Sequence, residues 1–196
     1  DSLAQEYGVE VEDVSVMSGD NTALIQLQDL DRDGERETAV TFFRVSEAEK
    51  PLKIYFFTRT AEDTYTVSAM VEGNGTAIYR VDYVDLNGSG CKEVVVSWQM
   101  STGVYLLGAY SLEEAMVRSL QYAASAPAGS ASAQGLPDRE ALRATEWMTT
   151  VYDNYALYDL DQDTRTELAV VRVDKAGTNS AVDLYGWRDG SFMVLS

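Results

Sequence analysis

The sequence has no histidine, one cysteine and three prolines among 196 residues, and only 15 basic side chains against 32 acidic ones. The lack of histidine excludes catalysis by imidazole and zinc sites that combine Cys with His. Cys91 has no second cysteine for an intramolecular disulfide. The net charge of −17 disfavours binding to nucleic acid, which relies on clustered cations. We expect such acidity to serve solubility, cation binding or a basic partner.

Long apolar runs are also missing, so the sequence predicts no membrane insertion. The apolar content of 45% is nevertheless ordinary for a folded protein, and the length suits one domain or an array of small repeats. The chain begins at Asp1 without a methionine or a signal peptide. We therefore expect a mature or trimmed product, and the low cysteine content is compatible with a bacterial cell surface as well as with a cytosol.

Three acidic segments align without gaps, and each precedes an apolar run. Each has Asp at position one, Leu at two, Asp or Asn at three, a polar residue at five and Glu at nine. The second segment begins 56 residues after the first, and the third begins 74 residues after the second. We call them loop one (DLDRDGERE, 29–37), loop two (DLNGSGCKE, 85–93) and loop three (DLDQDTRTE, 159–167).

Residues typical of strands flank each loop, and turn signals separate them. The pattern predicts an all-β fold, with one domain over 1–196 built from three units of four short antiparallel strands. The units are expected at 11–60, 64–122 and 138–196, with a flexible loop of small residues at 123–137. Strands are expected after the loops at 38–45, 94–99 and 168–173, and short helices at 138–148 and around 112–117.

Carboxylates at alternating positions of a tight loop repel one another, and a hard divalent cation removes that repulsion by collecting oxygen ligands. A glycine at position six, such as Gly34, allows a sharp turn. Calcium accepts many flexible oxygen ligands and so fits better than magnesium. An EF-hand is excluded because position twelve needs an acid, and Val40, Val96 and Val170 stand there. Asp, Asn and Gly also favour turns without any metal, which is the competing explanation.

The three loops are not expected to bind equally well. Loop two carries fewer charges, with Lys92 nearby, and Thr164 in loop three resists the positive φ that a glycine allows. We therefore rank loop one first, loop three second and loop two third. The candidate side-chain ligands are Asp29, Asp31, Asp33 and Glu37 in loop one, Asp85, Asn87, Ser89 and Glu93 in loop two, and Asp159, Asp161, Asp163 and Glu167 in loop three.

The loop pattern resembles the calcium loops of FG-GAP and VCBS-type repeats, which build β-propellers in the integrin α-chain head and in many bacterial surface proteins. The resemblance implies propeller-blade-like repeats and non-catalytic calcium ions, with the carbonyls of Glu35, Cys91 and Arg165 as further ligands. It also implies a protein that is extracellular or at a cell surface, for example a bacterial lipoprotein with its anchor removed. Propellers have four to eight blades, and only three units are visible here. The chain is therefore expected to be a piece of a longer protein, an open arc, or half of a dimeric ring.

Three functions remain open at this stage. The first is a binding or adhesion module for an unknown protein or carbohydrate ligand, with a homodimer among the arrangements considered. The second is a structural segment of a larger cell-surface protein. The third, a polysaccharide-active enzyme, lacks support because the sequence shows no nucleophile–base pair, nucleophile elbow or phosphate loop.

Overall fold

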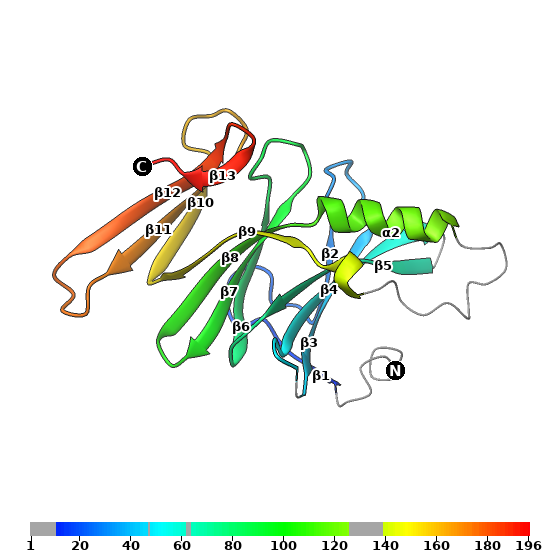
Figure 1. Ribbon diagram of the computed structural model, residues 1–196, viewed down its shortest axis with the longest axis horizontal. Helices are drawn as coiled ribbons and strands as arrows, with labels where there is room; N and C mark the ends of the chain where they lie inside the picture. Colours follow the sequence, from blue (N-terminus) through cyan, green and yellow to red (C-terminus); the bar gives the residue numbers. More distant parts are fainter. Residues whose placement is uncertain (1–10, 47, 62–63, 126–138) are drawn as a thin grey trace.

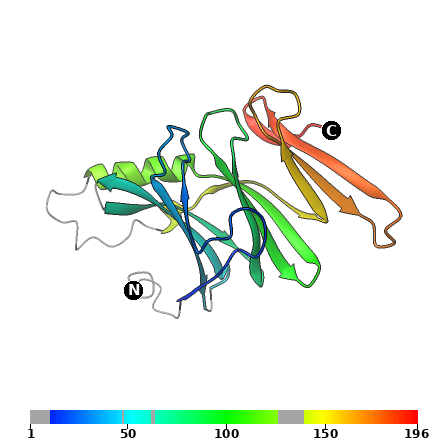
Figure 2. The same cartoon turned by 180° about the vertical axis from the view of Figure 1, so that it is seen from behind.

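A computed structural model describes residues 11–46, 48–61, 64–125 and 139–196 of the chain. Its strands form three antiparallel sheets, which confirms the predicted all-β class. The sheets follow one another along the chain and stand side by side, with the second between the other two (Figures 1 and 2). No helix in the described ranges combines the length and apolarity needed to cross a membrane.

Sheet one carries its first strand in two pieces. Both β1 and β2 pair with the same edge of β3, β2 with its first half and β1 with its last three residues, while β4 occupies the other edge. The strands of sheet one are β1 (Val11–Asp13), β2 (Ile25–Gln28), β3 (Thr38–Val45), β4 (Leu52–Ala61) and β5 (Thr64–Gly73).

Sheets two and three are regular four-stranded meanders. Sheet two consists of β6 (Ala77–Val84), β7 (Glu93–Ser101), β8 (Val104–Ser111) and β9 (Thr145–Tyr152). Sheet three consists of β10 (Asn154–Tyr158), β11 (Glu167–Val173), β12 (Ser180–Arg188) and β13 (Ser191–Val194). The helices α2 (Glu113–Ser125) and α3 (Arg139–Leu142) lie between β8 and β9 in the sequence.

The strand pairing divides the chain one strand later than predicted. β5 falls in the predicted second unit but pairs with β4, because the two ten-residue strands pair along their whole length. Likewise β9 falls in the predicted third unit but pairs with β8. Sheets one and two therefore each end with the strand that the sequence pattern assigned to the next unit.

The predicted helix over 138–148 is wrong, since only the four residues of α3 are helical and β9 begins at Thr145. The alternation of Thr, Val and aromatic residues in β9 favours a strand, and pairing with β8 supplies the partner. The helix expected around 112–117 extends from Glu113 to Ser125. Residues 123–125 of the predicted flexible loop 123–137 thus belong to α2, and the rest of that loop lies outside the described residues.

Apolar side chains fill both spaces between neighbouring sheets. Between sheets one and two, Val40 and Phe42 of β3 belong to the same buried cluster as Val96 and Trp98 of β7. Gly73 has no side chain where Trp98 packs, and a Cβ there would lie 2.5 Å from the indole ring. The core between sheets two and three contains Leu86, Val95, Leu107, Ala109, Tyr152, Tyr155, Leu168 and Val170.

Helices α2 and α3 cover the β5 side of the face of sheet one that points away from sheet two. Leu142 of α3 packs with Tyr55 and Met70, and Ser119 of α2 donates from Oγ to the Val67 carbonyl at 2.7 Å. Just before β9, the Ala144 N–H donates to the Met70 carbonyl at 2.8 Å. The segment between β8 and β9, which packs on sheet one, therefore joins the outer edges of sheets one and two.

Candidate metal centre

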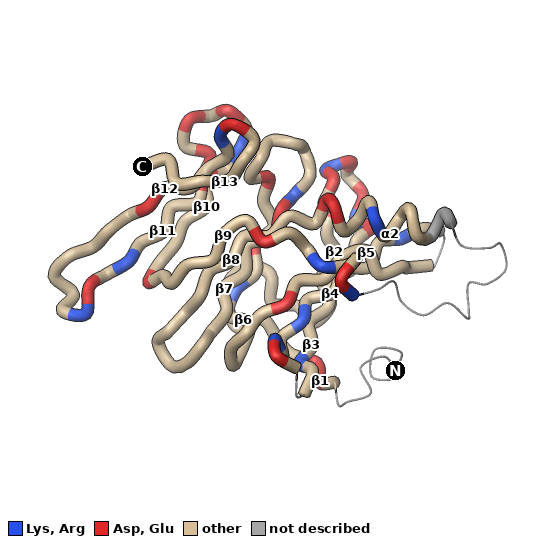
Figure 3. Tube along the Cα trace, viewed as in Figure 1, with Lys and Arg blue, Asp and Glu red and all other residues tan. Residues whose placement is uncertain are grey.

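The three acidic loops occupy equivalent places in the three sheets. Loop one joins β2 to β3, loop two joins β6 to β7, and loop three joins β10 to β11, so each connects the first pair of strands in its sheet. They lie along the upper edge of the molecule in Figure 1. Figure 3 shows acidic residues gathered at loops one and three.

A common set of hydrogen bonds gives the three loops one shape. The backbone N–H of position seven donates to the side chain of position five: Glu35 to Asp33 Oδ1 at 2.8 Å, Cys91 to Ser89 Oγ at 3.2 Å, and Arg165 to Asp163 Oδ1 at 2.9 Å. The N–H of position six donates to Oδ2 of position one: Gly34 to Asp29 at 3.1 Å, Gly90 to Asp85 at 3.0 Å, and Thr164 to Asp159 at 3.1 Å. The first carboxylate thus anchors each turn, and in loops two and three its other oxygen also accepts a backbone N–H, from Gly88 to Asp85 Oδ1 at 2.7 Å and from Asp163 to Asp159 Oδ1 at 3.2 Å.

The shared shape requires two residues with positive φ. Position six has φ of +98° at Gly34, +90° at Gly90 and +77° at Thr164. Position four has φ of +61° at Arg32 and Gln162 and +76° at Gly88. Thr164 adopts the positive φ that a β-branched residue was expected to resist. Its backbone is therefore strained at this position. The requirement at position four has no consistent signal in the sequence, because only loop two has glycine there.

Loop one brings four carboxylates together. One oxygen from each of Asp29, Asp31, Asp33 and Glu37 lies within 4.8 Å of the others. Among the described residues, Asp29 Oδ1 and Glu37 Oε2 are buried and accept no hydrogen bond. A buried carboxylate oxygen without a partner is costly, and a bound cation would satisfy both atoms. The donor set is all oxygen, so loop one fits the hard cation that the sequence predicts.

Loop three brings together three carboxylates, those of Asp159, Asp161 and Glu167. Glu167 is nearly buried, and its Oε2 accepts the Leu160 N–H at 2.8 Å. The remaining predicted ligand, Asp163, has its Oδ2 3.5 Å from the Arg165 guanidinium. Loop three therefore has a cluster of three carboxylates, and its fourth carboxylate, that of Asp163, lies near the Arg165 side chain instead.

Loop two is partly neutralised by loop one. Asp85 Oδ2 lies 3.1 Å from Nη1 of Arg32, which is a loop-one residue. Glu93 is only 2% exposed and accepts the Leu86 N–H at 2.8 Å. Burial, together with the nearby charge of Asp85, raises the pKa of Glu93 to about 7. The described residues of this loop include no group of three converging acids.

The strand register explains why the ninth residue behaves differently in loop one. In sheets two and three the Glu is the first paired residue of the second strand, with Glu93 opposite Val84 and Glu167 opposite Tyr158. In sheet one the pairing begins one residue later, with Thr38 opposite Gln28. Glu37 is therefore outside the strand, and its carboxylate is not held by the N–H of position two.

Successive loops are joined by backbone hydrogen bonds at the same position. The N–H of position eight in loop two, Lys92, donates to the Leu30 carbonyl of loop one at 2.7 Å. The same group of loop three, Thr166, donates to the Asp85 carbonyl of loop two at 2.9 Å. A cation that stiffens one loop would therefore also hold the next sheet in place.

Two arginines near the loops were missed by sequence reasoning. Arg32 reaches Asp85, and the Arg165 side chain lies against loop two, where a Cβ at Gly88 would be 2.8 Å from Arg165 Nε. Both contacts join residues more than fifty positions apart, so motif spacing cannot reveal them. The carbonyl ligands predicted at Glu35, Cys91 and Arg165 lie in the turn closed by the position-seven hydrogen bond, and their role stays a prediction.

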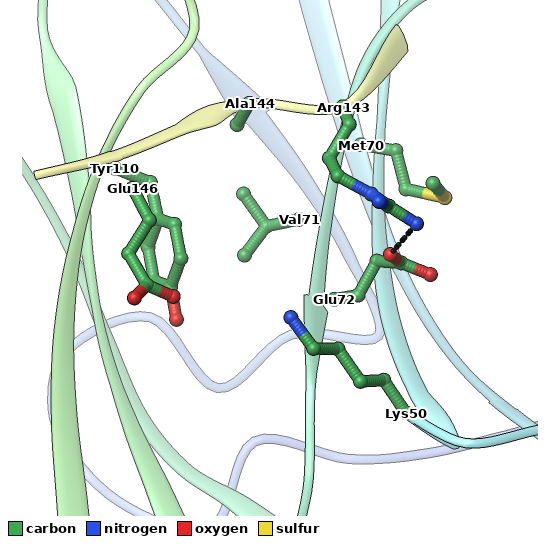
Figure 4. Close-up of a pocket in the computed structure, with 8 residues that line it drawn as sticks. All are labelled: Lys50, Met70, Val71, Glu72, Tyr110, Arg143, Ala144 and Glu146. Atoms are coloured by element: carbon green, nitrogen blue, oxygen red, sulfur yellow. Dashed lines mark ion pairs between the residues drawn. The ribbon is translucent and has the colours of Figure 1, made fainter. Parts of the chain in front are cut away.

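A separate cavity lies between the outer edges of sheets one and two (Figure 4). Two of its lining residues form an ion pair, with Glu72 Oε1 2.6 Å from Arg143 Nη2, and Glu72 Oε2 also contacts Lys53 of β4. Although burial alone would raise the pKa of Glu72, the cations beside it bring that pKa below its usual value. The cavity thus closes around an internal ion-pair network, which fixes β4, β5 and the start of β9.

Comparisons with protein-family models, with curated proteins and with solved structures yield no match for this chain.

Proposed function

We propose that the chain is a calcium-stabilised module of the β-propeller type, in which the acidic loops hold Ca²⁺ and thereby fix neighbouring blade-like sheets. The observation that carries the proposal is the pair of buried oxygens in loop one, Asp29 Oδ1 and Glu37 Oε2, that accept no hydrogen bond from the described residues. They belong to a cluster of four carboxylates. Loop three is the second site, and loop two is the weakest.

Calcium suits these loops better than magnesium. The carboxylates belong to turn residues, and Asp29 of loop one uses Oδ2 for the backbone and keeps Oδ1 for a cation. Calcium tolerates six to eight such oxygens in irregular geometry, while magnesium prefers a strict octahedron with several waters. Affinities on the order of 10⁻⁴ to 10⁻³ M are typical of extracellular calcium modules. We therefore place the protein outside the cell or at its surface.

The role we propose is structural and binding rather than catalytic. The acids of the loops are committed to holding turns, and the chain has no histidine to act as a base. Burial and the surrounding acids raise the pKa of the Cys91 thiol, so its reactive thiolate is disfavoured. The rigid array presents its loops along one edge, which suits an adhesion module or a segment of a larger surface protein.

Thermal unfolding with calcium, magnesium or EDTA tests the proposal. A cation that binds only the folded state at ten times its Kd adds about 1.4 kcal/mol, so for a Kd of about 10⁻⁴ M we expect 1 mM calcium to raise Tm by roughly 3–6 °C. Magnesium should have a much smaller effect. Asp31→Asn should remove most of the calcium-dependent rise, while Glu12→Gln, the same charge change on exposed β1, should leave it intact.

Equal melting temperatures in calcium and EDTA would refute the calcium proposal. Isothermal titration calorimetry of the same proteins provides a direct count of the bound ions. Two sites are expected, with the tighter one lost in Asp31→Asn. If Glu12→Gln abolished the response as strongly, the effect would be one of net charge rather than of a site.

A further inference from the structure

The face of sheet three turned away from sheet two is apolar, and most of it is exposed among the described residues. Leu168 and Val170 of β11 point into the core toward sheet two, so their neighbours Ala169 and Val171 point to the other side. Val182 pairs with Val171 on that side and is 58% exposed. Tyr158 and Met193 also lie on this face, and both are exposed. In a chain with a net charge of −17, a sheet face so poor in charge indicates an interface.

The opposite end of the array has a matching uncovered surface. In β2 the polar Gln26 is buried toward sheet two, where its Oε1 accepts the Tyr83 hydroxyl at 2.6 Å. Ile25 and Leu27 therefore point away from sheet two, and they are 64% and 49% exposed. Helices α2 and α3 cover only the β5 side of this face, which leaves the β2 and β3 side open.

These two surfaces correspond to the two halves of the junctions already present between the sheets. The leucine at position two of each loop shows this most directly. Leu30 is 4% exposed in the core between sheets one and two, and Leu86 is fully buried between sheets two and three. Leu160, at the same position of loop three, is 54% exposed. Sheet three thus ends in half of a junction, and a further sheet would complete it.

We propose that the occupant is a second copy of this chain, whose sheet one packs against sheet three of the first, and whose sheet three receives sheet one of the first. The two open surfaces lie at opposite ends of the array, so these three sheets do not bring them together (Figures 1 and 2). Head-to-tail pairing about a twofold axis covers both ends of both copies and closes a ring of six sheets.

The hydrogen bonds between loops support this orientation. Within the chain, the position-eight N–H of each following loop donates to a carbonyl at the start of the preceding loop, as Thr166 does to Asp85. At the ends of the array, the corresponding groups are the Arg36 N–H of loop one and the carbonyls that begin loop three. The head-to-tail ring brings these groups to the same seam, whereas pairing of two sheets three would leave Ile25 and Leu27 exposed.

Sedimentation equilibrium of the full chain tests the ring. In moderate salt with millimolar calcium, we expect a species of twice the 21.6 kDa chain mass. High salt should strengthen association, because each copy carries a charge of −17. Val182→Glu and Ile25→Glu should each raise the dissociation constant roughly a hundredfold or more, since each places an unpaired carboxylate in a junction. Val104→Glu, at an exposed valine beside the β7–β8 turn, is the matched control and should leave the dimer unchanged.

A mixing experiment separates head-to-tail pairing from the alternatives. Ile25→Glu and Val182→Lys should each be monomeric alone, but their mixture should associate, because one junction then holds opposite charges and the other is unaltered. A monomer at all concentrations, larger open polymers, a dimer broken by only one of the two substitutions, or a mixture that stays monomeric would each overturn the proposal. The variants leave the three loops intact and are also measured in EDTA, so this result is independent of calcium binding.

Discussion

Loops one and three contain Asp, Asp, Asp and Glu at the same positions, yet they differ in how many carboxylates converge. All four meet in loop one, whereas three meet in loop three and Asp163 turns toward Arg165. Glu167 is fixed by the Leu160 N–H, while Glu37 has a buried oxygen without a partner among the described residues. The number of acids in a loop therefore does not determine how many carboxylates converge.

The difference between Glu37 and Glu167 comes from the strand that follows each loop. A shift of one residue in pairing turns every side chain of a strand to the other face. Pairing that starts at Thr38 instead of Glu37 releases the Glu from the sheet, and it also directs Val40 and Phe42 toward sheet two. In sheet three, by contrast, Glu167 is part of the strand. Register thus decides whether the Glu keeps a carboxylate oxygen free of backbone hydrogen bonds and which residues form the core, while the contact with Arg165 accounts for the absence of Asp163 from the loop-three cluster.

The strongest test of this comparison removes the first carboxylate from each loop. In calcium, Asp29→Ala should lower the free energy of unfolding by about 3 kcal/mol, because it deletes a ligand and leaves the Gly34 N–H without its charged acceptor. Asp159→Ala should cost about 1–2 kcal/mol, since its weaker cation site contributes less. In EDTA, the two losses should become similar. Urea unfolding measures each value.

Glu12→Ala, which removes a charge at an exposed residue of β1, is the control. It should change the free energy of unfolding little in calcium or in EDTA. If Asp29→Ala and Asp159→Ala lost equal stability in calcium, the inference that register controls the sites would be wrong.

The second test uses pH to compare loop two with its neighbours. A carboxyl group with a raised folded pKa binds its proton more tightly in the folded state, so its contribution is most favourable below the unfolded pKa of about 4.5. The contribution of Glu93 to the free energy of unfolding is therefore lost as pH rises through its folded pKa of about 7. Each unit between the two pKa values corresponds to about 1.4 kcal/mol, and after screening by solvent we expect a loss of about 2 kcal/mol between pH 5 and 8 in EDTA.

Urea unfolding of the wild type and Glu93→Gln across this pH range measures the effect. The variant should show a flatter profile, because Gln cannot ionise. A cation at loop two would lower the pKa of Glu93, so millimolar calcium should also flatten the wild-type profile if this loop binds. An identical slope in wild type and Glu93→Gln would show that another group causes the pH dependence.

Local patterns predicted much of this molecule, and contacts between distant residues account for the rest. The strand at Thr38–Val45 was predicted with its exact bounds, because alternating apolar residues follow a strong turn signal. Residues 145–148 were predicted as helix because a short apolar run is ambiguous until β8 is available as a partner. The approach of Arg32 to Asp85 depends on how two loops meet, which no single motif encodes. The three loops were found because their spacing is a property of the sequence itself.

The smallest expected effect concerns position six of loop three. Thr164 has a φ of +77°, and a β-branched residue in this region costs about 1–2 kcal/mol. Thr164→Gly should therefore raise the free energy of unfolding by about 1 kcal/mol, after the greater flexibility of glycine in the unfolded chain is taken into account. It should also bring the calcium affinity of loop three closer to that of loop one. Thr166→Gly is the matched control. Thr166 does not have a positive φ, so this substitution should lower the free energy of unfolding of the protein. Equal and unfavourable changes at the two positions, measured by urea unfolding, would show that strain at position six does not separate these loops.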